Sequence, residues 1–198
     1  LRGAGTIYDN NIFDHNNFRL FPGGSSCGGM KLHPGVEGAG KLGISNMTVR
    51  NSTFSNTFGC IALWFDWMED GLLVENNTFI NNTVDLSFEV TDGTAEKPNI
   101  VRNNIFKDTH KIGRVFTELI PQIEVKSSKY THIYNNLFYN SSLGVLMMRT
   151  ENPTGGGGNE PERAFLQNNQ AFNNIFVNVS APLMMMRNST DGKSVGNV

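Results

Sequence analysis

A short block recurs along this chain and restricts the folds that it can adopt. Most copies carry a pair of polar residues, Asn prominent among them, then one further residue and a Phe. The copies are YDNNIF, VRNSTF, VENNTF, VRNNIF, IYNNLF and AFNNIF, and they end at Phe13, Phe54, Phe79, Phe106, Phe138 and Phe176. A second, mostly apolar block follows each copy: GGMKLHP, CIALWFDW, VDLSFEV, RVFTELI, GVLMMRT and APLMMMRN. Such self-similarity indicates a stack of structural repeats.

Each repeat has room for two or three short strands separated by polar turns. Asn tolerates left-handed backbone geometry at a corner, and its amide can bond to an Asn one repeat away. The Phe that follows would point inward and stack on the next Phe. The sequence therefore predicts an all-β chain, a right-handed parallel β-helix of about six rungs with inserted loops. We expect residues 1–198 to form one such domain, either complete or part of a longer protein.

Other repeat folds suit the sequence less well. A leucine-rich repeat would carry Leu at fixed places, and a helical solenoid would show a 3.6-residue period that the Asn-rich blocks interrupt. A β-propeller needs a blade of roughly 40 residues, which is longer than the interval between Phe54 and Phe79.

Charge and hydropathy limit the partners. The formal net charge is −2, which gives no reason to expect nucleic acid or an anionic membrane surface. We also find no apolar run near the length of about 18 residues that crosses a membrane. Association with a second copy or with the rest of a longer chain stays open. The location is also open, with a secreted or periplasmic protein favoured.

Alternation within the second blocks predicts which side chains face outward. Placing Ile61, Leu63 and Phe65 inside puts Ala62, Trp64 and Asp66 outside. The same assignment in the other repeats gives one outward column of His33, Asp66, Glu89, Glu118, Arg149 and Arg187. The column two residues earlier is Lys31, Trp64, Ser87, Phe116, Met147 and Met185.

The two cysteines fit this register. Cys27 precedes His33 by six residues, and Cys60 precedes Asp66 by six residues. They should lie on neighbouring rungs, at a separation that a disulfide permits. A disulfide and a pair of reduced core cysteines both remain open, because the compartment is unknown.

Stacked carboxylates on adjacent strands destabilise a sheet, so catalysis explains Asp66 and Glu89 better than structure does. They are 23 residues apart, which we interpret as one rung. Retaining glycosidases hold two carboxyl groups about 5–5.5 Å apart. Lys31 and His33 would keep Asp66 ionised as the nucleophile, although both could be ordinary surface charges. Glu89, between Asp66 and Glu118, would have a raised pKa and act as acid/base.

Further side chains could bind substrate. Trp64 and Trp67 offer flat apolar surfaces to a sugar ring, although Trp67 could equally pack under a loop. Arg149 could pair with Glu118 or hold sugar hydroxyls. Arg149 and Arg187 could also be solvated charges at strand ends.

The motifs LWFDWM, VENNTFINN and DLSFEV resemble the core of β-helix glycoside hydrolases, most of all glycoside hydrolase family 120, the β-xylosidases. The resemblance covers roughly Gly28 to Val90. It implies that Asp66 is the nucleophile and Glu89 the acid/base. The segment GGMKLHP is similar to one in that family that places Lys31 and His33 beside the sugar at the non-reducing end.

We therefore expect a retaining glycoside hydrolase that acts by double displacement on xylosides or related plant-polysaccharide oligosaccharides, without cofactor or metal. One alternative is a β-helix polysaccharide lyase, in which Lys31, His33 and Arg149 act on a uronate and the carboxylates bind Ca²⁺. Another is a non-catalytic carbohydrate-binding β-helix.

Overall fold

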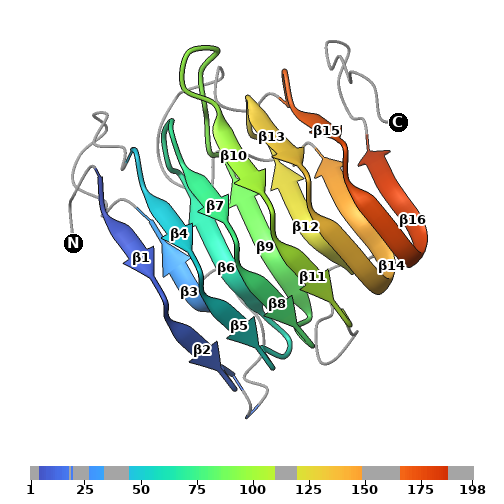
Figure 1. The fold of residues 1–198 in the computed structure, drawn as a ribbon. Coiled ribbons are helices and arrows are strands. Elements are labelled where there is room, and N and C mark those ends of the chain that lie inside the picture. The colour runs from blue at the N-terminus through green and yellow to red at the C-terminus, as the bar shows by residue number, and fades with distance from the viewer. Residues whose placement is uncertain are drawn as a thin grey trace.

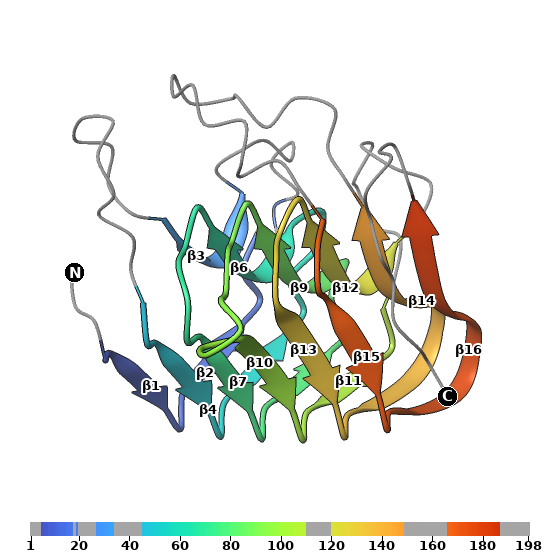
Figure 2. The same ribbon diagram turned by 90° about the horizontal axis from the view of Figure 1, so that it is seen from above.

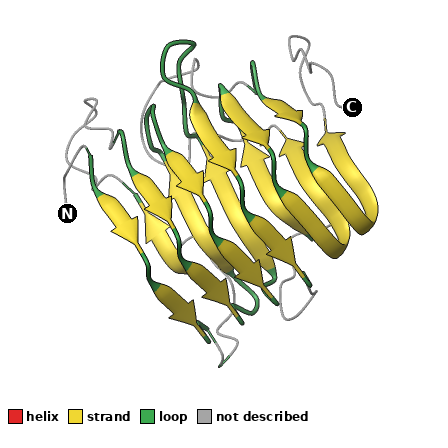
Figure 3. Ribbon diagram, in the orientation of Figure 1, coloured by secondary structure: helices red, strands yellow, loops and turns green. Residues whose placement is uncertain are grey.

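A computed structural model describes residues 5–17, 19, 27–33, 45–109, 120–148 and 166–186. Within these ranges all the regular structure is β-strand, and the described residues contain no helix. Short loops join the strands (Figure 3). The prediction of an all-β chain is confirmed for this part of the protein.

The strands form two sheets whose paired strands are all parallel. In the six-stranded sheet each strand pairs with its counterpart in the next repeat, in the order β1-β4-β7-β10-β13-β15. Its strands are β1 (Ile7–Asp9), β4 (Thr48–Arg50), β7 (Leu73–Glu75), β10 (Asn99–Arg102), β13 (Thr131–Tyr134) and β15 (Gln170–Phe172). This stepwise order is that of a solenoid-like coil (Figure 1).

The ten-stranded sheet folds back on itself. It runs from β2 through β5, β8 and β11 to β14, and returns through β12, β9 and β6 to β3, while β16 pairs with β14. The strands are β2 (Ile12–Asp14), β5 (Thr53–Ser55), β8 (Thr78–Ile80), β11 (Ile105–Lys107), β14 (Leu137–Met148), β12 (Pro121–Lys126), β9 (Val84–Glu89), β6 (Ile61–Asp66), β3 (Gly28–Leu32) and β16 (Ile175–Met186). Seen from above, the two sheets enclose the interior between them (Figure 2).

The recurring Phe residues form a continuous stack inside this coil, as predicted. Ring centroids of successive residues lie 4.7 to 5.0 Å apart, with the rings nearly parallel. The stack runs through Phe13, Phe54, Phe79, Phe106, Phe138 and Phe176. The spacing matches the distance between paired strands of about 4.8 Å, so the repeat of the sheet also sets the packing of the core.

The polar pair before each Phe makes the corner. The first Asn of the pair has a positive φ of 52° to 58° in every repeat: Asn10, Asn51, Asn76, Asn103, Asn135 and Asn173. Asn is among the few residues that adopt this geometry readily. The second residue of the pair bonds to the neighbouring repeat, as the sequence predicted.

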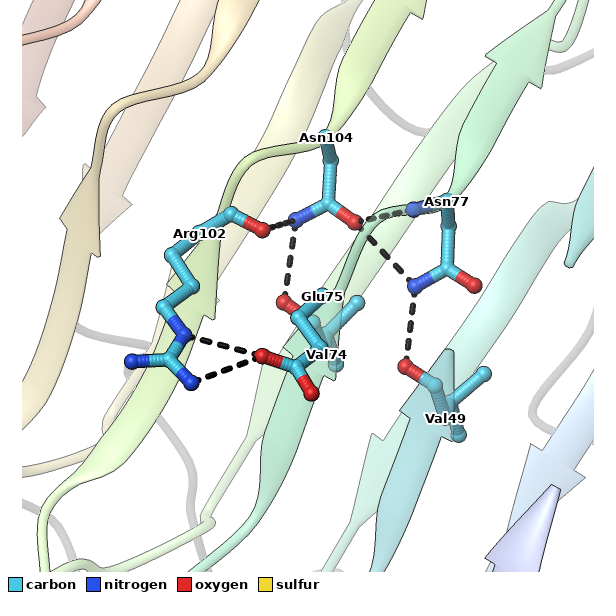
Figure 4. Close-up of polar contacts among 6 residues, drawn as sticks. All are labelled: Val49, Val74, Glu75, Asn77, Arg102 and Asn104. Atoms are coloured by element: carbon cyan, nitrogen blue, oxygen red, sulfur yellow. Dashed lines mark hydrogen bonds and ion pairs between the residues drawn. The ribbon is translucent and has the colours of Figure 1, made fainter. Parts of the chain in front are cut away.

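Asn104 shows how the second Asn holds two repeats together (Figure 4). Its side-chain oxygen accepts hydrogen bonds from the backbone N–H of Asn77 at 2.9 Å and from the side-chain amide of Asn77 at 3.1 Å. Its own amide donates to the carbonyls of Val74 and Arg102, each at 2.9 Å. Asn77 in turn donates to the carbonyl of Val49 at 2.9 Å. The buried backbone groups of the corners are therefore satisfied by side chains.

Replacing Asn104 by Ala should lower the free energy of unfolding by about 3 kcal/mol, because several buried groups lose their partners at once. The matched control is Arg102→Gln, two residues before Asn104 in the chain. It removes a partly exposed ion pair in which the Arg102 guanidinium lies 2.7 Å from Oε2 of Glu75. That pair should contribute less than about 1 kcal/mol. Urea denaturation of both variants measures the difference, and equal losses would contradict the assigned role of Asn104.

Candidate functional site

The candidate site lies on the outward face of the returning limb of the ten-stranded sheet. On β6, β9 and β12 the residues Leu63, Leu86 and Ile123, and then Phe65, Phe88 and Val125, belong to the main core. The residues between and after them face the other way and form two rows. The Trp64 row is Lys31, Trp64, Ser87, Glu124 and Leu146. The Asp66 row is Asp66, Glu89, Lys126 and Met148.

Asp66 and Glu89 are direct register partners on the neighbouring parallel strands β6 and β9. Their Cα atoms are therefore separated by about one strand spacing, roughly 4.8 Å. The prediction that 23 residues make one step between strands is confirmed at this position. The pairings of Lys31 with Trp64 and of Trp64 with Ser87 are confirmed as well.

The predicted column is wrong beyond Glu89. In the sheet, the neighbour of β9 on the side away from β6 is β12 (Pro121–Lys126), so Lys126 pairs with Glu89 where Glu118 was expected. Likewise Glu124, and not Phe116, pairs with Ser87. More residues separate β12 from its NNIF block than separate β9 from its NNTF block, so spacing from the block does not predict the register of β12. Glu118 and Phe116 themselves lie outside the described residues.

The predicted register of β14 and β16 is wrong by one residue. Met148 pairs with Lys126 and with Met186, so neither Arg149 nor Arg187 aligns with the Asp66 row. In the Trp64 row, Leu146 and Met184 take the places expected for Met147 and Met185. Met147 belongs to the main core, so its side chain faces away from this surface. Arg149 and Arg187 lie outside the described residues.

The start of β6 also differs from strict alternation. Ala62, expected outside, belongs to the main core, and Ile61, expected inside, packs with Trp64 and Val84 in a separate cluster. The strand pairing passes from Ile61–Val84 directly to Leu63–Leu86. Alternation is regular only from Leu63 onward, which leaves the placement of Trp64 and Asp66 as predicted.

Asp66 lies in a charged and largely buried environment. Its Oδ2 is 2.8 Å from the Lys31 ammonium and 3.9 Å from Nε2 of His33. The same ammonium lies 3.6 Å from the centroid of the Trp64 ring, a cation–π contact. Only 7 % of Asp66 is exposed. The structure thus brings together Lys31, His33 and Trp64 around Asp66, as the sequence predicted.

Glu89 has different surroundings. Burial raises its pKa above the ordinary value, Lys126 opposes the rise, and the nearby carboxylates Asp66 and Glu124 add to it. Within the described residues no hydrogen bond or ion pair holds its carboxyl group. The predicted direction of the pKa is confirmed, but burial is its main cause, and the second carboxylate is Glu124 rather than Glu118.

Sequence reasoning missed the pair Glu124 and Lys126. The Lys126 ammonium lies 2.8 Å from Oε2 of Glu124, and the two side chains are only 11 % and 1 % exposed. The signal was present in the segment PQIEVK, where apolar Ile123 and Val125 alternate with polar residues. That alternation is typical of a strand with one apolar face.

Among the buried polar atoms near the carboxylates, Nε1 of Trp64 and Oγ of Ser87 make no hydrogen bond within the described part of the chain. Both belong to the Trp64 row, next to the carboxylate pair.

Trp67 follows Asp66 in a left-handed conformation, with φ of 57°, and its backbone N–H donates to the carbonyl of Glu89 at 2.9 Å. This bond links the turn after Asp66 to the strand that carries Glu89. The sugar-binding role of Trp67 stays a prediction.

A disulfide joins Cys27 to Cys60, with the Cα atoms 5.4 Å apart. It resolves the choice left open by the sequence. β3, which carries Lys31, is the last strand of its sheet and pairs with β6. The disulfide therefore ties the start of this edge strand to the chain that leads into β6 and Asp66.

The double replacement Cys27→Ser and Cys60→Ser should lower the free energy of unfolding by about 3 kcal/mol in the chain-entropy description of a cross-link. The expected result is a lower Tm, which calorimetry measures. Dithiothreitol should lower the Tm of the wild-type protein and leave that of the double variant unchanged. An equal effect of the reductant on both proteins would show that it acts elsewhere.

Among the described residues, no group of three or more His, Cys, Asp or Glu side chains is arranged to hold a metal ion. The same ranges contain no helix long and apolar enough to cross a membrane.

Comparison with known proteins adds no assignment. No family model matches this sequence, and no curated protein and no solved structure matches the chain.

Proposed function

We propose that this chain is a retaining glycoside hydrolase built on a right-handed parallel β-helix of about six rungs. The observation that supports the activity best is the direct pairing of Asp66 with Glu89 on one outward face, in unlike environments. Asp66 is paired with an ammonium group, whereas Glu89 has a raised pKa and a carboxyl that no described residue holds. Paired carboxyl groups with divided roles are the requirement of glycoside hydrolysis.

The two carboxyl groups would work in sequence. In the first step Asp66 attacks the anomeric carbon while Glu89 gives its proton to the departing glycosidic oxygen. The products are a glycosyl ester on Asp66 and a free alcohol. In the second step Glu89 takes a proton from water, the water oxygen attacks the anomeric carbon, and the Asp66 carboxylate departs. Neighbouring strands suit this mechanism, since retaining enzymes need about 5–5.5 Å between the carboxyl groups.

Xylosides, or related oligosaccharides from plant polysaccharides, are the proposed substrates. The support is the resemblance of the segment from Gly28 to Val90 to glycoside hydrolase family 120. The surroundings of Asp66 are compatible with a sugar, because they combine an aromatic ring with charged groups able to bond to hydroxyls.

The fold proposal rests on the regular step from repeat to repeat. The six-stranded sheet takes one strand from each repeat, and the Phe stack has one member from each. A coil of six rungs accounts for both series.

An assay of the full chain on aryl β-xylosides tests the proposed activity. The expected result is release of the aryl group, with the first-formed sugar in the β-configuration by proton NMR. A first-formed α-anomer would exclude the double displacement. Uronate polymers are tested in parallel by ultraviolet absorbance: an unsaturated product whose formation stops with EDTA would replace this proposal by a lyase. Binding of oligosaccharides without turnover would replace it by a carbohydrate-binding module.

A further inference from the structure

We infer that the charges of the buried pair of Lys126 and Glu124 control how strongly Glu89 holds its proton, so that Glu89 can act first as acid and then as base. This inference rests on the proposed function and concerns residues that the resemblance to glycosidases does not cover. Lys126 and Glu124 are positioning residues here, because they act through Glu89 and need not touch the substrate.

The register places both residues against the strand of the acid/base. Lys126 is the direct partner of Glu89, and Glu124 is the direct partner of Ser87, two residues earlier on β9. Both belong to β12, so they lie on the side of Glu89 opposite Asp66. Glu89 thus stands between a carboxylate on one neighbouring strand and an ammonium group on the other.

The ammonium of Lys126 is held back from Glu89 by Glu124. The short contact of Lys126, at 2.8 Å, goes to Glu124, and both side chains are nearly fully buried. A buried ion pair keeps its geometry because separating the two charges costs several kcal/mol. Lys126 therefore exerts its charge on Glu89 from a fixed position without forming a salt bridge that would keep Glu89 ionised.

Among the described residues, the charged groups facing Glu89 come from three strands. The next strand, β14, contributes the uncharged Leu146 and Met148 to these rows. The charged or titratable groups are Lys31 and His33 from β3 and its end, Asp66 from β6, and Glu124 and Lys126 from β12. In the free enzyme Asp66 and Glu124 favour protonated Glu89, and Lys126 and Lys31 oppose them.

Formation of the glycosyl ester changes this balance. Asp66 becomes neutral, so its effect on Glu89 disappears and the charge of Lys31 is no longer compensated by it. Burial and Glu124 still favour the proton, but Lys126 and Lys31 no longer act against Asp66, so loss of the proton from Glu89 becomes easier. Glu89 is thereby converted to the base that the second step requires. Lys126 opposes protonation of Glu89 in both states, so the loss of the Asp66 charge is enough to shift the balance toward ionised Glu89.

Two substitutions should shift the titration of Glu89 in opposite directions. Lys126→Met removes the cation that lowers the pKa of Glu89 most and should therefore raise this pKa. Lys126 has a larger effect on the pKa of Glu89 than Glu124 has. Glu124→Gln removes an anion and releases Lys126 toward Glu89, so the pKa should fall. We expect about a tenfold change in the acid dissociation constant in each case.

The direct measurement is a ¹³C NMR titration of the Glu89 carboxyl in the full chain, with Glu89→Gln to assign the signal. The pH profile of kcat/KM for an aryl β-xyloside should show the same shifts on its alkaline side. Lys126→Arg, which keeps the charge, should restore most of the wild-type titration. The control is Lys129→Met, which breaks a longer and more exposed pair with Asp92 at 3.5 Å and should leave the Glu89 titration unchanged.

Shifts in the same direction for Lys126→Met and Glu124→Gln, or no shift in either, would overturn the inference. A general loss of folding cannot mimic the expected result, because it would not change sign between the two variants. The NMR titration needs no turnover. If no glycoside is cleaved but the opposite shifts are found, the proposed function fails and the electrostatic role of the pair stands.

Discussion

Asp66→Ala is expected to reduce kcat/KM for an aryl β-xyloside by about four orders of magnitude, or about 5.5 kcal/mol of transition-state stabilisation. Without this carboxylate no glycosyl ester can form, and the charge that develops on the sugar ring loses its partner. Azide, added as an external nucleophile, should restore turnover and yield a glycosyl azide of inverted anomeric configuration. NMR of the azide product identifies the configuration directly.

Glu89→Ala should give a different pattern. Substrates with a poor leaving group need the proton of Glu89 and should become almost inert, whereas an activated aryl leaving group departs without it. The control for both variants is Glu75→Gln, which removes a charge from the six-stranded sheet, away from the candidate site, and should leave kcat/KM unchanged. If Asp66→Ala and Glu89→Ala both kept wild-type activity, the assignment of the site would be wrong.

The stability of the protein should decrease as the pH rises toward neutrality, because of Asp85. Asp85 is fully buried on β9 and accepts hydrogen bonds from Asn82 at 2.8 Å and from Thr109 at 3.2 Å. Burial raises its pKa to about 7, although both hydrogen bonds act in the opposite direction. In the unfolded chain the pKa is near 3.8. Between these two values the folded protein holds a proton that the unfolded chain has lost.

The sign follows from this difference. The contribution of Asp85 to folding is complete below about pH 4, falls as the pH rises, and levels off above about pH 7. Its full size is roughly 4 kcal/mol, at about 1.4 kcal/mol for each unit between the two pKa values. Urea denaturation at closely spaced pH values between 4 and 8 measures it.

Asp85→Asn should remove most of this pH dependence. The amide can keep both contacts, by accepting from Asn82 and donating to the hydroxyl of Thr109, and it carries no charge at any of these pH values. The variant should therefore be more stable than the wild-type protein at pH 8. The control is Asp9→Asn: hydrogen bonds from Asn51 and Arg50 lower the pKa of Asp9, so this group titrates only below about pH 4 and its replacement should leave the slope between pH 4 and 8 unchanged. Parallel curves for the wild-type protein and Asp85→Asn would show that Asp85 is not the titrating group.

The sequence alone determined the parts of this structure that repeat. Phe54 and Phe79 stack, and Asn104 binds Asn77 across repeats, because each block is local and the same block recurs with little insertion. The pairing of Asp66 with Glu89 could be predicted for the same reason. Both strands follow their Asn–Phe blocks closely, and alternation then assigns the side of each residue.

The surroundings of that pair depend on contacts between distant parts of the chain. Inserted residues before β12 separate its register from the local pattern, so Lys126 and not Glu118 is the partner of Glu89. Burial likewise depends on contacts between distant segments, and burial is the main cause of the raised pKa of both Glu89 and Asp85. Local spacing places a side chain on a face of a strand. The long-range packing of the chain determines its charged neighbours and its access to water, and these determine its proton affinity.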